Sequence, residues 1–399
     1  MADHGWAILA CGSKTTGCRF DERMRKENTH MLVTGGAGFI GSFVVDHLLA
    51  EGYHVRILDS LCPQVHPHGR PDYLNPAAEF IHGDVRDKET LRSALDHADG
   101  VIHCAAAVGV GQSMYQVAHY SDVNVRGTAT LLDLLIERKN SPAKLIILSS
   151  MTGYGEGVYR RPSDGMLMRV GIRSEDGIRR YGWEPVCPET GEILEGVATP
   201  EDAALMADNI YALTKRYQEE MALGLGRFYG FPVVCLRLFN VYGPRQSLCN
   251  PYTGVLAIFM SRLLSGSSPL VYEDGRQTRD FVSVHDVVQA IMLAFERDDA
   301  NGRVINIGSG ESRSIEGCAR VLARLIGRED LDPEIISKFR KGDIRHCTAD
   351  IRRAKTLIDY EPRVDWEDGL AELIGWAGSA PFADHLDMAQ DELKERGIV

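Results

Sequence analysis

The stretch TGGAGFIG (34–41) is the part of the sequence that decides the fold. It follows a short apolar run, MLVT, and leads into a segment (38–51) whose apolar residues recur with helical spacing. Glycines at 35, 38 and 41 permit a tight turn and let a pyrophosphate approach the helix N-terminus, whose free N–H groups favour an anion. This context predicts a dinucleotide-binding turn, and a turn that serves only helix–strand packing is the alternative. We expect cofactor contacts at Gly35, Gly38, Phe39, Ile40 and Gly41.

Two carboxylates follow the next strands. Asp59 ends the predicted strand HVRILD (54–59), where it can accept hydrogen bonds from the adenosine ribose. A carboxylate at this position repels a 2′-phosphate, so NAD is favoured over NADP. Asp84 ends the predicted strand at 79–84; with Val85 it either contacts the adenine or serves as the N-cap of the following helix.

Strand and helix patterns alternate from residue 30 to about residue 240. Apolar strand-like runs at 54–59, 79–84, 100–105 and 144–150 are separated by helical patterns such as 118–138. This alternation predicts an α/β fold, a Rossmann-type doubly wound parallel sheet, with a smaller C-terminal α/β substrate lobe.

The domain limits follow from changes in the pattern. We expect a poorly ordered extension at 1–29, the NAD-binding domain at 30–240, a lobe that is mainly substrate-binding at 241–379, and a terminal helix at 380–399. Residues 153–207 are rich in turn formers and weakly periodic. A connection of that length is unusual unless it is functional, so we interpret 156–207 as an insertion over the substrate cleft.

Composition limits the partners. The chain has 399 residues and a net charge of −12, which argues against nucleic acid as the main partner. No apolar run is long enough to span a bilayer, so we expect no membrane partner. The nine cysteines include no CxxC pair, which favours reduced thiols in the cytoplasm and no metal site.

Three residues form the candidate catalytic set. Ser150 lies at the carboxyl end of the strand KLIILSS (144–150), the edge at which open parallel sheets bind ligands. Tyr211 and Lys215 in NIYALTK (209–215) are one helical turn apart. At about 100° per residue, one stripe of this helix, which we assign to the core, holds Ile210, Leu213, Tyr217 and Met221. A second stripe, which we expect to face the cofactor, holds Tyr211, Lys215, Gln218 and Ala222.

To act as a base at neutral pH, Tyr211 would need a lowered pKa. A free tyrosine has a pKa of ~10, and lowering it by about three units takes ~4 kcal/mol. A cation ~4 Å away supplies about that much at an effective dielectric constant of ~20. We therefore expect Lys215, together with the positively charged nicotinamide ring, to lower the pKa of Tyr211. A surface i,i+4 pair without a catalytic role is the alternative.

The motifs together resemble a known family. TGGAGFIG, HCAAA (103–107), NVRGT (124–128), the serine at a strand end and the YxxxK pattern are similar to the extended short-chain dehydrogenase/reductases that act on nucleotide sugars, over roughly residues 30–375. The resemblance implies that Tyr211 is the general base or acid, that Lys215 holds the nicotinamide ribose, and that Ser150 hydrogen bonds the reacting sugar oxygen. It also implies cofactor contacts at Ala105, Ala106 and Asn124.

The resemblance extends to the substrate. RLFNVYGPRQ (237–246) and DGRQTRDFVSVHDV (274–287) place Asn240 and Arg279 where the family contacts the diphosphate. FRKGDIRH (339–346) places Arg340 at the diphosphate and Asp343 at the nucleoside ribose. Met151, Thr152 and Cys347 complete the expected sugar pocket, and Cys347 stands where some UDP-galactose 4-epimerases have a bulky tyrosine.

The residues after Ser150 bear on the reaction. Dehydratases of the family carry Asp-Glu there, whereas this chain has Met151 and Thr152, which argues against dehydration. Reductases of the family usually prefer NADP, which Asp59 disfavours. The resemblance therefore implies epimerisation at C4: Tyr211 removes the 4-hydroxyl proton as hydride moves from C4 to NAD, and hydride returns to the opposite face of the 4-keto sugar.

Several further stretches bear on the substrate. PQVH (63–66), AAAVGVGQSMY (105–115) and NPYTGVLAIF (250–259) resemble the branch of the family that converts dTDP-L-rhamnose to dTDP-6-deoxy-L-talose. A UDP-hexose or UDP-uronate 4-epimerase, a nucleotide-sugar reductase and a non-catalytic NAD-binding sensor are the alternatives. Family analogy also implies a homodimer formed through two helices beside the sheet.

Overall fold

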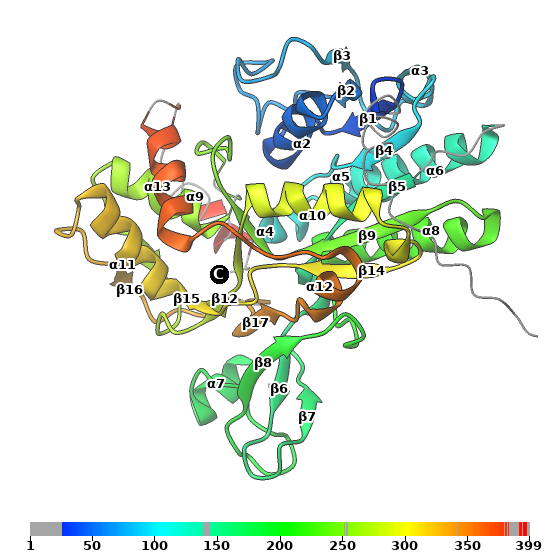
Figure 1. Ribbon diagram of the computed structural model, residues 1–399. Coiled ribbons are helices and arrows are strands. Elements are labelled where there is room, and N and C mark those ends of the chain that lie inside the picture. The colour runs from blue at the N-terminus through cyan, green and yellow to red at the C-terminus, as the bar shows by residue number, and fades with distance from the viewer. Residues whose placement is uncertain are drawn as a thin grey trace, which may run out of the picture.

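The computed structural model describes residues 26–138, 144–250, 252, 254–340, 342–378, 380, 382, 391–392 and 394–396. A sheet of seven parallel strands forms its centre, in the order β14-β9-β5-β4-β1-β2-β3 (Figure 1). These strands are β1 (His30–Thr34), β2 (His54–Asp59), β3 (Glu79–His82), β4 (Gly100–His103), β5 (Lys144–Ser150), β9 (Val233–Leu238) and β14 (Val304–Ile307). The order runs outward in both directions from β1 and β4, so the predicted Rossmann-type fold is confirmed.

Helices cover both faces of the sheet because side chains alternate along each strand. In β1, Met31 and Val33 pack on one side, in a core shared with helices α2 (Phe39–Ala50), α10 (Val284–Glu296) and α12 (Arg352–Ile358). Leu32 packs on the other side, in a core shared with α3 (Lys88–Ala94), α6 (Gly127–Glu137) and α8 (Ile210–Tyr229). Before α6 come the short helices α4 (Val110–Ser113) and α5 (Val117–Tyr120) and a π-helical turn, η1 (Ser121–Arg126).

The second lobe has its own core. It is built on three amphipathic helices, α9 (Val255–Leu264), α11 (Ile315–Ile326) and α13 (Trp366–Ala377), which bury a common apolar cluster. Short parallel pairs, β10 (Asn240–Tyr242) with β13 (Phe281–Ser283) and β11 (Leu270–Val271) with β16 (Glu334–Ile335), complete its frame. The η3 turn (Asp298–Ala300) precedes β14.

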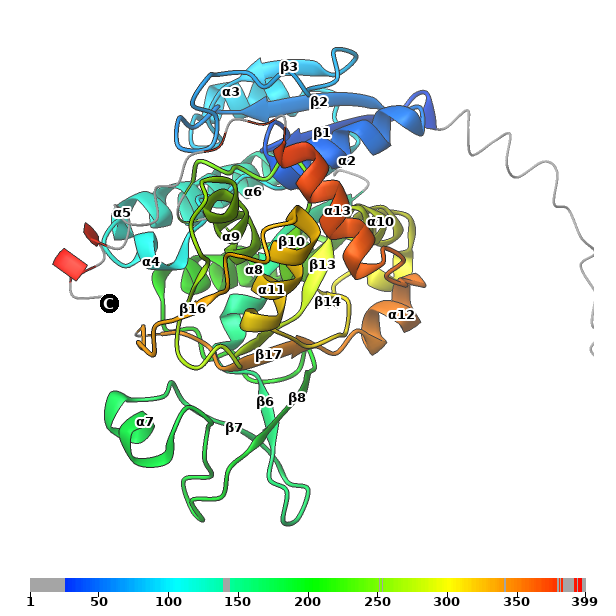
Figure 2. The ribbon, with the colours of Figure 1, turned by 90° about the vertical axis from the view of Figure 1, so that its left-hand side faces the viewer.

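The long insertion is folded, contrary to its irregular sequence pattern. It contains β6 (Val158–Arg160), β7 (Leu167–Arg169), α7 (Glu175–Tyr181) and β8 (Glu195–Thr199), and it projects from one end of the molecule (Figure 2). Its strands extend a six-stranded sheet, β15-β12-β17-β8-β6-β7, which joins it to β12 (Thr278–Arg279), β15 (Arg313–Ser314) and β17 (His346–Ala349). A small buried cluster that includes Tyr159, Cys187 and Leu194 gives the insertion a core of its own.

Helix α8 is rotated relative to our prediction. Asn209 caps its first turn by accepting the N–H of Ala212, and Gly230 ends it in the left-handed conformation. The predicted core stripe was wrong: Tyr217 is 52% exposed, and Ile210, Leu213 and Met221 are only partly buried. The buried face instead carries polar side chains that have partners inside the protein, namely Tyr211, Thr214, Lys215, Gln218 and Glu219.

The chain ends fall largely outside the described residues. Of the extension predicted at 1–29, residues 26–29 are described, and the ammonium of Lys26 pairs with Glu51 and Glu296. Of the helix predicted at 380–399, residues 391–392 and 394–395 are helical and most of the others are not described. The domain limits themselves stay predictions. Within the described ranges, no helix combines the length and the apolarity that a bilayer crossing requires.

Candidate active site

The glycine turn lies between β1 and α2 and leaves no room for a side chain at Gly35 or Gly41. Gly35 has φ of +69°, and a Cβ on it would lie 2.7 Å from the backbone nitrogen of Ala105. A Cβ on Gly41 would overlap the carbonyl oxygen of Gly35. Gly38 precedes the first turn of α2 without a capping side chain, so the N–H groups of that turn are free to bind an anion. This arrangement suits the pyrophosphate of a dinucleotide.

Asp59 is fixed at the end of β2. Its carboxylate accepts the N–H of Ala37 at 3.0 Å and that of Leu61 at 2.9 Å, and its residue is buried. These two bonds hold the charge beside the glycine turn, and the predicted role of Asp59 at the adenosine ribose stays a prediction.

Asp84 follows β3 and does not cap α3. That helix is capped by Asp87, which accepts the N–H groups of Glu89 and Thr90, so the N-cap alternative for Asp84 was wrong. The carboxylate of Asp84 instead pairs with the guanidinium of Arg86, and this contact lowers its pKa. Its predicted role at the adenine stays a prediction. Val85 beside it is buried against Gly127.

Residues after β4 are held in place by Asn124. Asn124 is fully buried in the π-helical turn, where its amide exchanges hydrogen bonds with both backbone groups of Ala107. Its Nδ2 also donates to Thr214 Oγ1 of α8 at 2.9 Å. Asn124 thereby fixes the loop that contains Ala105 and Ala106 against the catalytic helix.

The three predicted catalytic residues are brought together at the carboxyl end of β5. Lys215 is buried, and its Nζ donates to the carbonyl of Leu148 at 2.8 Å. The hydroxyl of Ser150 lies close enough to the phenol of Tyr211, which is 8% exposed, to lower its pKa. Ser150 Oγ also accepts the N–H of Thr152 at 3.3 Å and its hydroxyl at 3.0 Å. A reacting hydroxyl at this point would meet a phenol, a hydroxyl and a cation.

The pKa of Tyr211 differs from our expectation. Burial raises it to about 12, and the group that opposes this rise is the hydroxyl of Ser150, not Lys215. Burial also lowers the pKa of Lys215 to about 8, because its ammonium has a carbonyl and no carboxylate as its partner. We had expected Lys215 and the nicotinamide ring together to lower the pKa of Tyr211. In the protein without cofactor, Lys215 does not lower it.

The predicted substrate residues come from separate segments. Arg279 of β12 and Cys347 of β17 are paired neighbours in the six-stranded sheet. Cys347 is 1% exposed and shares an apolar cluster with Met151. The side-chain oxygen of Asn240 is buried and has no hydrogen-bond partner within the described part of the chain, so it is available to a ligand. Arg340 and Asp343 pair with each other at 2.9 Å.

Sequence reasoning missed several residues around Tyr211. Its N–H donates to Ser113 Oγ at 3.1 Å, and the ring of Tyr120 meets its ring edge-on at a centroid distance of 6.4 Å. Further along α8, Glu219 forms a buried ion pair with Arg237 of β9. Arg237 also donates to the hydroxyl of Tyr154 at 2.8 Å. The sequence did contain one signal: VVCLRL (233–238) places Arg237 in an otherwise apolar strand, which indicates a buried arginine that needs a charged partner.

The fold and the site together define a Rossmann-type, dinucleotide-dependent enzyme. Residues 31–169 and 186–308 match the NAD dependent epimerase/dehydratase family, and the chain belongs to this family. The gap between the two matched ranges, residues 170–185, lies within the insertion. NAD as cofactor and the epimerase class of enzyme, both predicted from the sequence, are thereby confirmed.

Three known proteins illustrate the relationship. A dTDP-L-rhamnose 4-epimerase of Burkholderia thailandensis is 34% identical over 354 residues, which are 87% of this chain and 94% of that protein. The structure of UDP-glucose 4-epimerase of Thermotoga maritima with UDP-glucose has a TM-score of 0.71 at 31% identity, covering 87% of this chain and 98% of that one. UDP-glucuronic acid 4-epimerase of Bacillus cereus, in complex with UDP-glucuronic acid and NAD, has a TM-score of 0.70 at 27% identity, covering 88% and 99%.

Proposed function

We propose that the protein is an NAD-dependent nucleotide-sugar 4-epimerase. The observation that carries this proposal is the composition of the site: Ser150, Tyr211 and Lys215 meet at the end of β5, and the next residues are Met151 and Thr152. The set contains a proton acceptor for a sugar hydroxyl. It lacks, at the two positions after Ser150, a carboxylate that would expel a neighbouring hydroxyl as water.

The side chains have distinct roles in this proposal. Ser150 hydrogen bonds the 4-oxygen, and Tyr211 accepts the 4-hydroxyl proton in one direction and returns it in the other. Lys215 binds the nicotinamide ribose. Bound NAD would supply a reversible hydride acceptor for C4, so that inversion at C4 would involve no net oxidation.

Ionisation of the Tyr211 phenol depends on the bound cofactor. Because burial holds the pKa of Tyr211 at about 12, a phenolate forms only when additional positive charge lies close to the ring. We infer that the site binds NAD before it ionises Tyr211, so that the phenol becomes a base only in the loaded enzyme.

We propose dTDP-L-rhamnose as the first substrate to test. Support comes from the relative of Burkholderia thailandensis, which is matched over most of both chains. A UDP-hexose or UDP-uronate is the second candidate, favoured by the likeness to the UDP-glucose and UDP-glucuronic acid epimerase structures. In either case Asn240 and Arg279 contact the diphosphate, and Arg340 and Asp343 contact the diphosphate and the nucleoside ribose.

The test is to incubate the purified protein, without added cofactor, with dTDP-L-rhamnose, UDP-glucose or UDP-glucuronate. Proton NMR of the sugar ring distinguishes the two C4 configurations. We expect one of the three to reach an equilibrium mixture of C4 epimers. No inversion with any of them would contradict the proposed function. In a separate assay with added NADPH, consumption of NADPH with net reduction of the sugar would make the protein a reductase.

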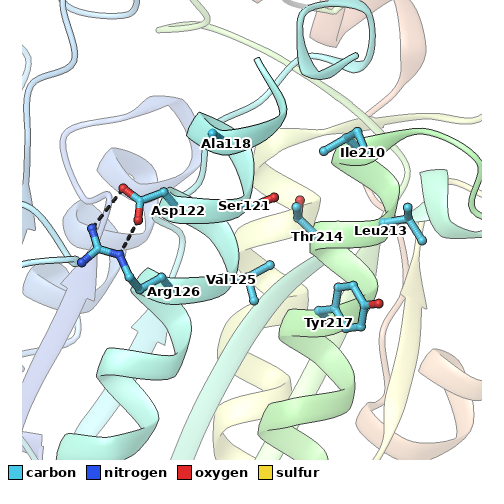
Figure 3. Close-up of a pocket in the computed structure, with 9 residues that line it drawn as sticks. All are labelled: Ala118, Ser121, Asp122, Val125, Arg126, Ile210, Leu213, Thr214 and Tyr217. Carbon is cyan, nitrogen blue, oxygen red and sulfur yellow. Dashed lines mark hydrogen bonds and ion pairs between the residues drawn. The ribbon is translucent and has the colours of Figure 1, made fainter. Parts of the chain in front are cut away.

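We also propose a homodimer, because an apolar surface lies over α5, η1 and α8 (Figure 3). A groove there is lined by the residues that we had assigned to the core, Ile210, Leu213 and Tyr217, together with Ala118 and Val125. The ion pair of Asp122 with Arg126 forms part of its rim. A second copy related by a two-fold axis would bury this stripe against its own equivalent. Leu213→Glu should give a monomer by light scattering if this surface is the interface.

We place the protein in the cytoplasm. Every described cysteine is a free thiol, in agreement with a reducing compartment. Fractionation of the source cells tests this placement.

A further inference from the structure

Six charged side chains, four of them buried, join the insertion to the segment 339–346, which is expected to bind the nucleotide. We call this cluster the ionic bridge; it consists of Glu156, Arg173, Glu184, Glu273, Asp274 and Arg345. The side chain of Arg345 is 0% exposed, that of Arg173 is 6% exposed and that of Glu273 is 1% exposed. Charges buried to this extent are tolerated only where each has partners, so the ionic bridge is a specific connection.

Arg345 occupies the centre of the ionic bridge. Its Nη1 lies 2.9 Å from Glu273 and 2.6 Å from Asp274, and its Nε donates to Glu184 at 3.0 Å. Its backbone N–H donates to both carboxylate oxygens of Glu156, at 2.9 and 3.0 Å. Glu156 and Glu184 belong to the insertion and Arg345 to the nucleotide segment, so these bonds fix one to the other.

Arg173 makes the second connection. Its guanidinium forms a two-bond contact with Glu273, at 2.7 and 3.0 Å, and its Nε lies 3.1 Å from Glu156. The same side chain donates to the backbone carbonyl of Asp343 at 3.0 Å and lies over the ring of Phe339 at 5.5 Å. One residue of the insertion therefore contacts the segment on both sides of Arg340.

The two side chains expected to contact the nucleotide stay accessible. Arg340 is 42% exposed and Asp343 23% exposed, and the two pair at 2.9 Å. Arg340 also lies over the ring of Tyr272, next in sequence to Glu273 of the ionic bridge, at 4.6 Å. Arg173 thus holds the backbone of the segment while Arg340 and Asp343 can still reach a ligand.

We propose that Arg173 is a positioning residue for the nucleotide diphosphate, acting through the segment that carries Arg340 and Asp343. This inference rests on the proposed nucleotide-sugar function and deepens it, because it assigns the insertion a part in nucleotide affinity. A segment that is ordered before binding does not have to be ordered by the ligand, which improves affinity. Without Arg173, the ligand itself would have to position Arg340 and Asp343.

The first test compares Arg173→Lys with the wild type. Lysine keeps the charge but cannot contact Glu273, Glu156 and the carbonyl of Asp343 together. We expect dTDP and UDP, titrated separately in a calorimeter, to bind at least about tenfold more weakly to the variant, with NAD content and near-UV circular dichroism unchanged. Arg161→Lys is the matched control: it is also an insertion arginine, but its carboxylate partners are Asp164 and Glu189 within the insertion. Equal nucleotide affinity of Arg173→Lys and the wild type would overturn the inference.

A double-mutant cycle tests whether Arg173 acts through this segment. If it does, the loss caused by Arg173→Lys should shrink to less than about threefold when Arg340→Ala is already present, because the positioned group is then gone. A general loosening of the protein would give additive losses, which would overturn the inference. Failure of the wild type to bind either nucleotide would instead contradict the proposed function.

Discussion

Glu219 and Arg237 form a buried ion pair between the catalytic helix α8 and strand β9 of the central sheet. The carboxylate is 5% and the guanidinium 6% exposed, and Ser149 Oγ also donates to Glu219 at 3.1 Å. Arg237 has further partners in the hydroxyl of Tyr154 and the carbonyl of Glu201. Glu219 thus joins the helix of Tyr211 both to β9, through Arg237, and to β5, the strand that ends at Ser150, through Ser149.

Glu219→Gln should therefore destabilise the protein strongly. It leaves Arg237 as a buried charge without its counter-ion, which typically costs about 3–5 kcal/mol of the free energy of unfolding. Glu220→Gln on the same helix is the control, since its partner Arg216 is exposed and such pairs contribute about 1 kcal/mol or less. Urea denaturation measures both; equal effects of the two variants would show that the buried pair has no special role.

Tyr211→Phe should abolish epimerisation and leave NAD bound. The change removes the oxygen that accepts the proton but keeps the ring that packs edge-on against Tyr120. Tyr217→Phe, which alters a 52% exposed tyrosine on the same helix, should keep normal activity. Turnover is measured by NMR and bound NAD by its release on denaturation. Retained activity in Tyr211→Phe would remove this residue from its assigned role.

Lys215 should make stability depend on pH. Its folded pKa of about 8 lies below its ordinary value of 10.5, so between these pH values the unfolded chain holds a proton that the folded protein has lost. The free energy of unfolding therefore rises with pH through this window. The wild type should gain on the order of 2 kcal/mol relative to Lys215→Met between pH 7 and pH 9.5. If the difference in the free energy of unfolding between wild type and Lys215→Met does not change with pH, burial does not lower the pKa of Lys215.

Asp59→Asn should weaken the preference for NAD over NADP. The substitution keeps a polar side chain that can bond Leu61 or Ala37 but removes the charge that repels a 2′-phosphate. We expect the ratio of the dissociation constants for the two cofactors to fall by about tenfold or more, measured by fluorescence titration of the cofactor-free protein. Asp84→Asn is the comparison, since Asp84 is paired with Arg86. An unchanged ratio in Asp59→Asn would place the discrimination elsewhere.

The fold and part of the site follow from local sequence patterns. The strand, turn and helix at 30–50 were predictable because the tight turn itself requires glycine, which the sequence shows at Gly35, Gly38 and Gly41. The orientation of α8 could not be predicted in this way, because an argument from hydrophobic periodicity assumes that the buried face of a helix is apolar. This helix buries Lys215, Gln218 and Glu219 instead, and their partners come from distant parts of the chain. The partners of Arg173 and Arg345 were hidden for the same reason: Glu273 and Glu156 are far from them in sequence.

The most direct test of the central claim is a measurement of the configuration at C4 in a nucleotide sugar incubated with the purified protein and no added cofactor. Proton NMR in D2O should show that dTDP-L-rhamnose, or a UDP-sugar, approaches a mixture of C4 epimers. The hydrogen at C4 should be retained rather than exchanged with solvent, because it returns from the bound cofactor. No inversion with any of these sugars, or exchange of the C4 hydrogen for deuterium during inversion, would contradict the account.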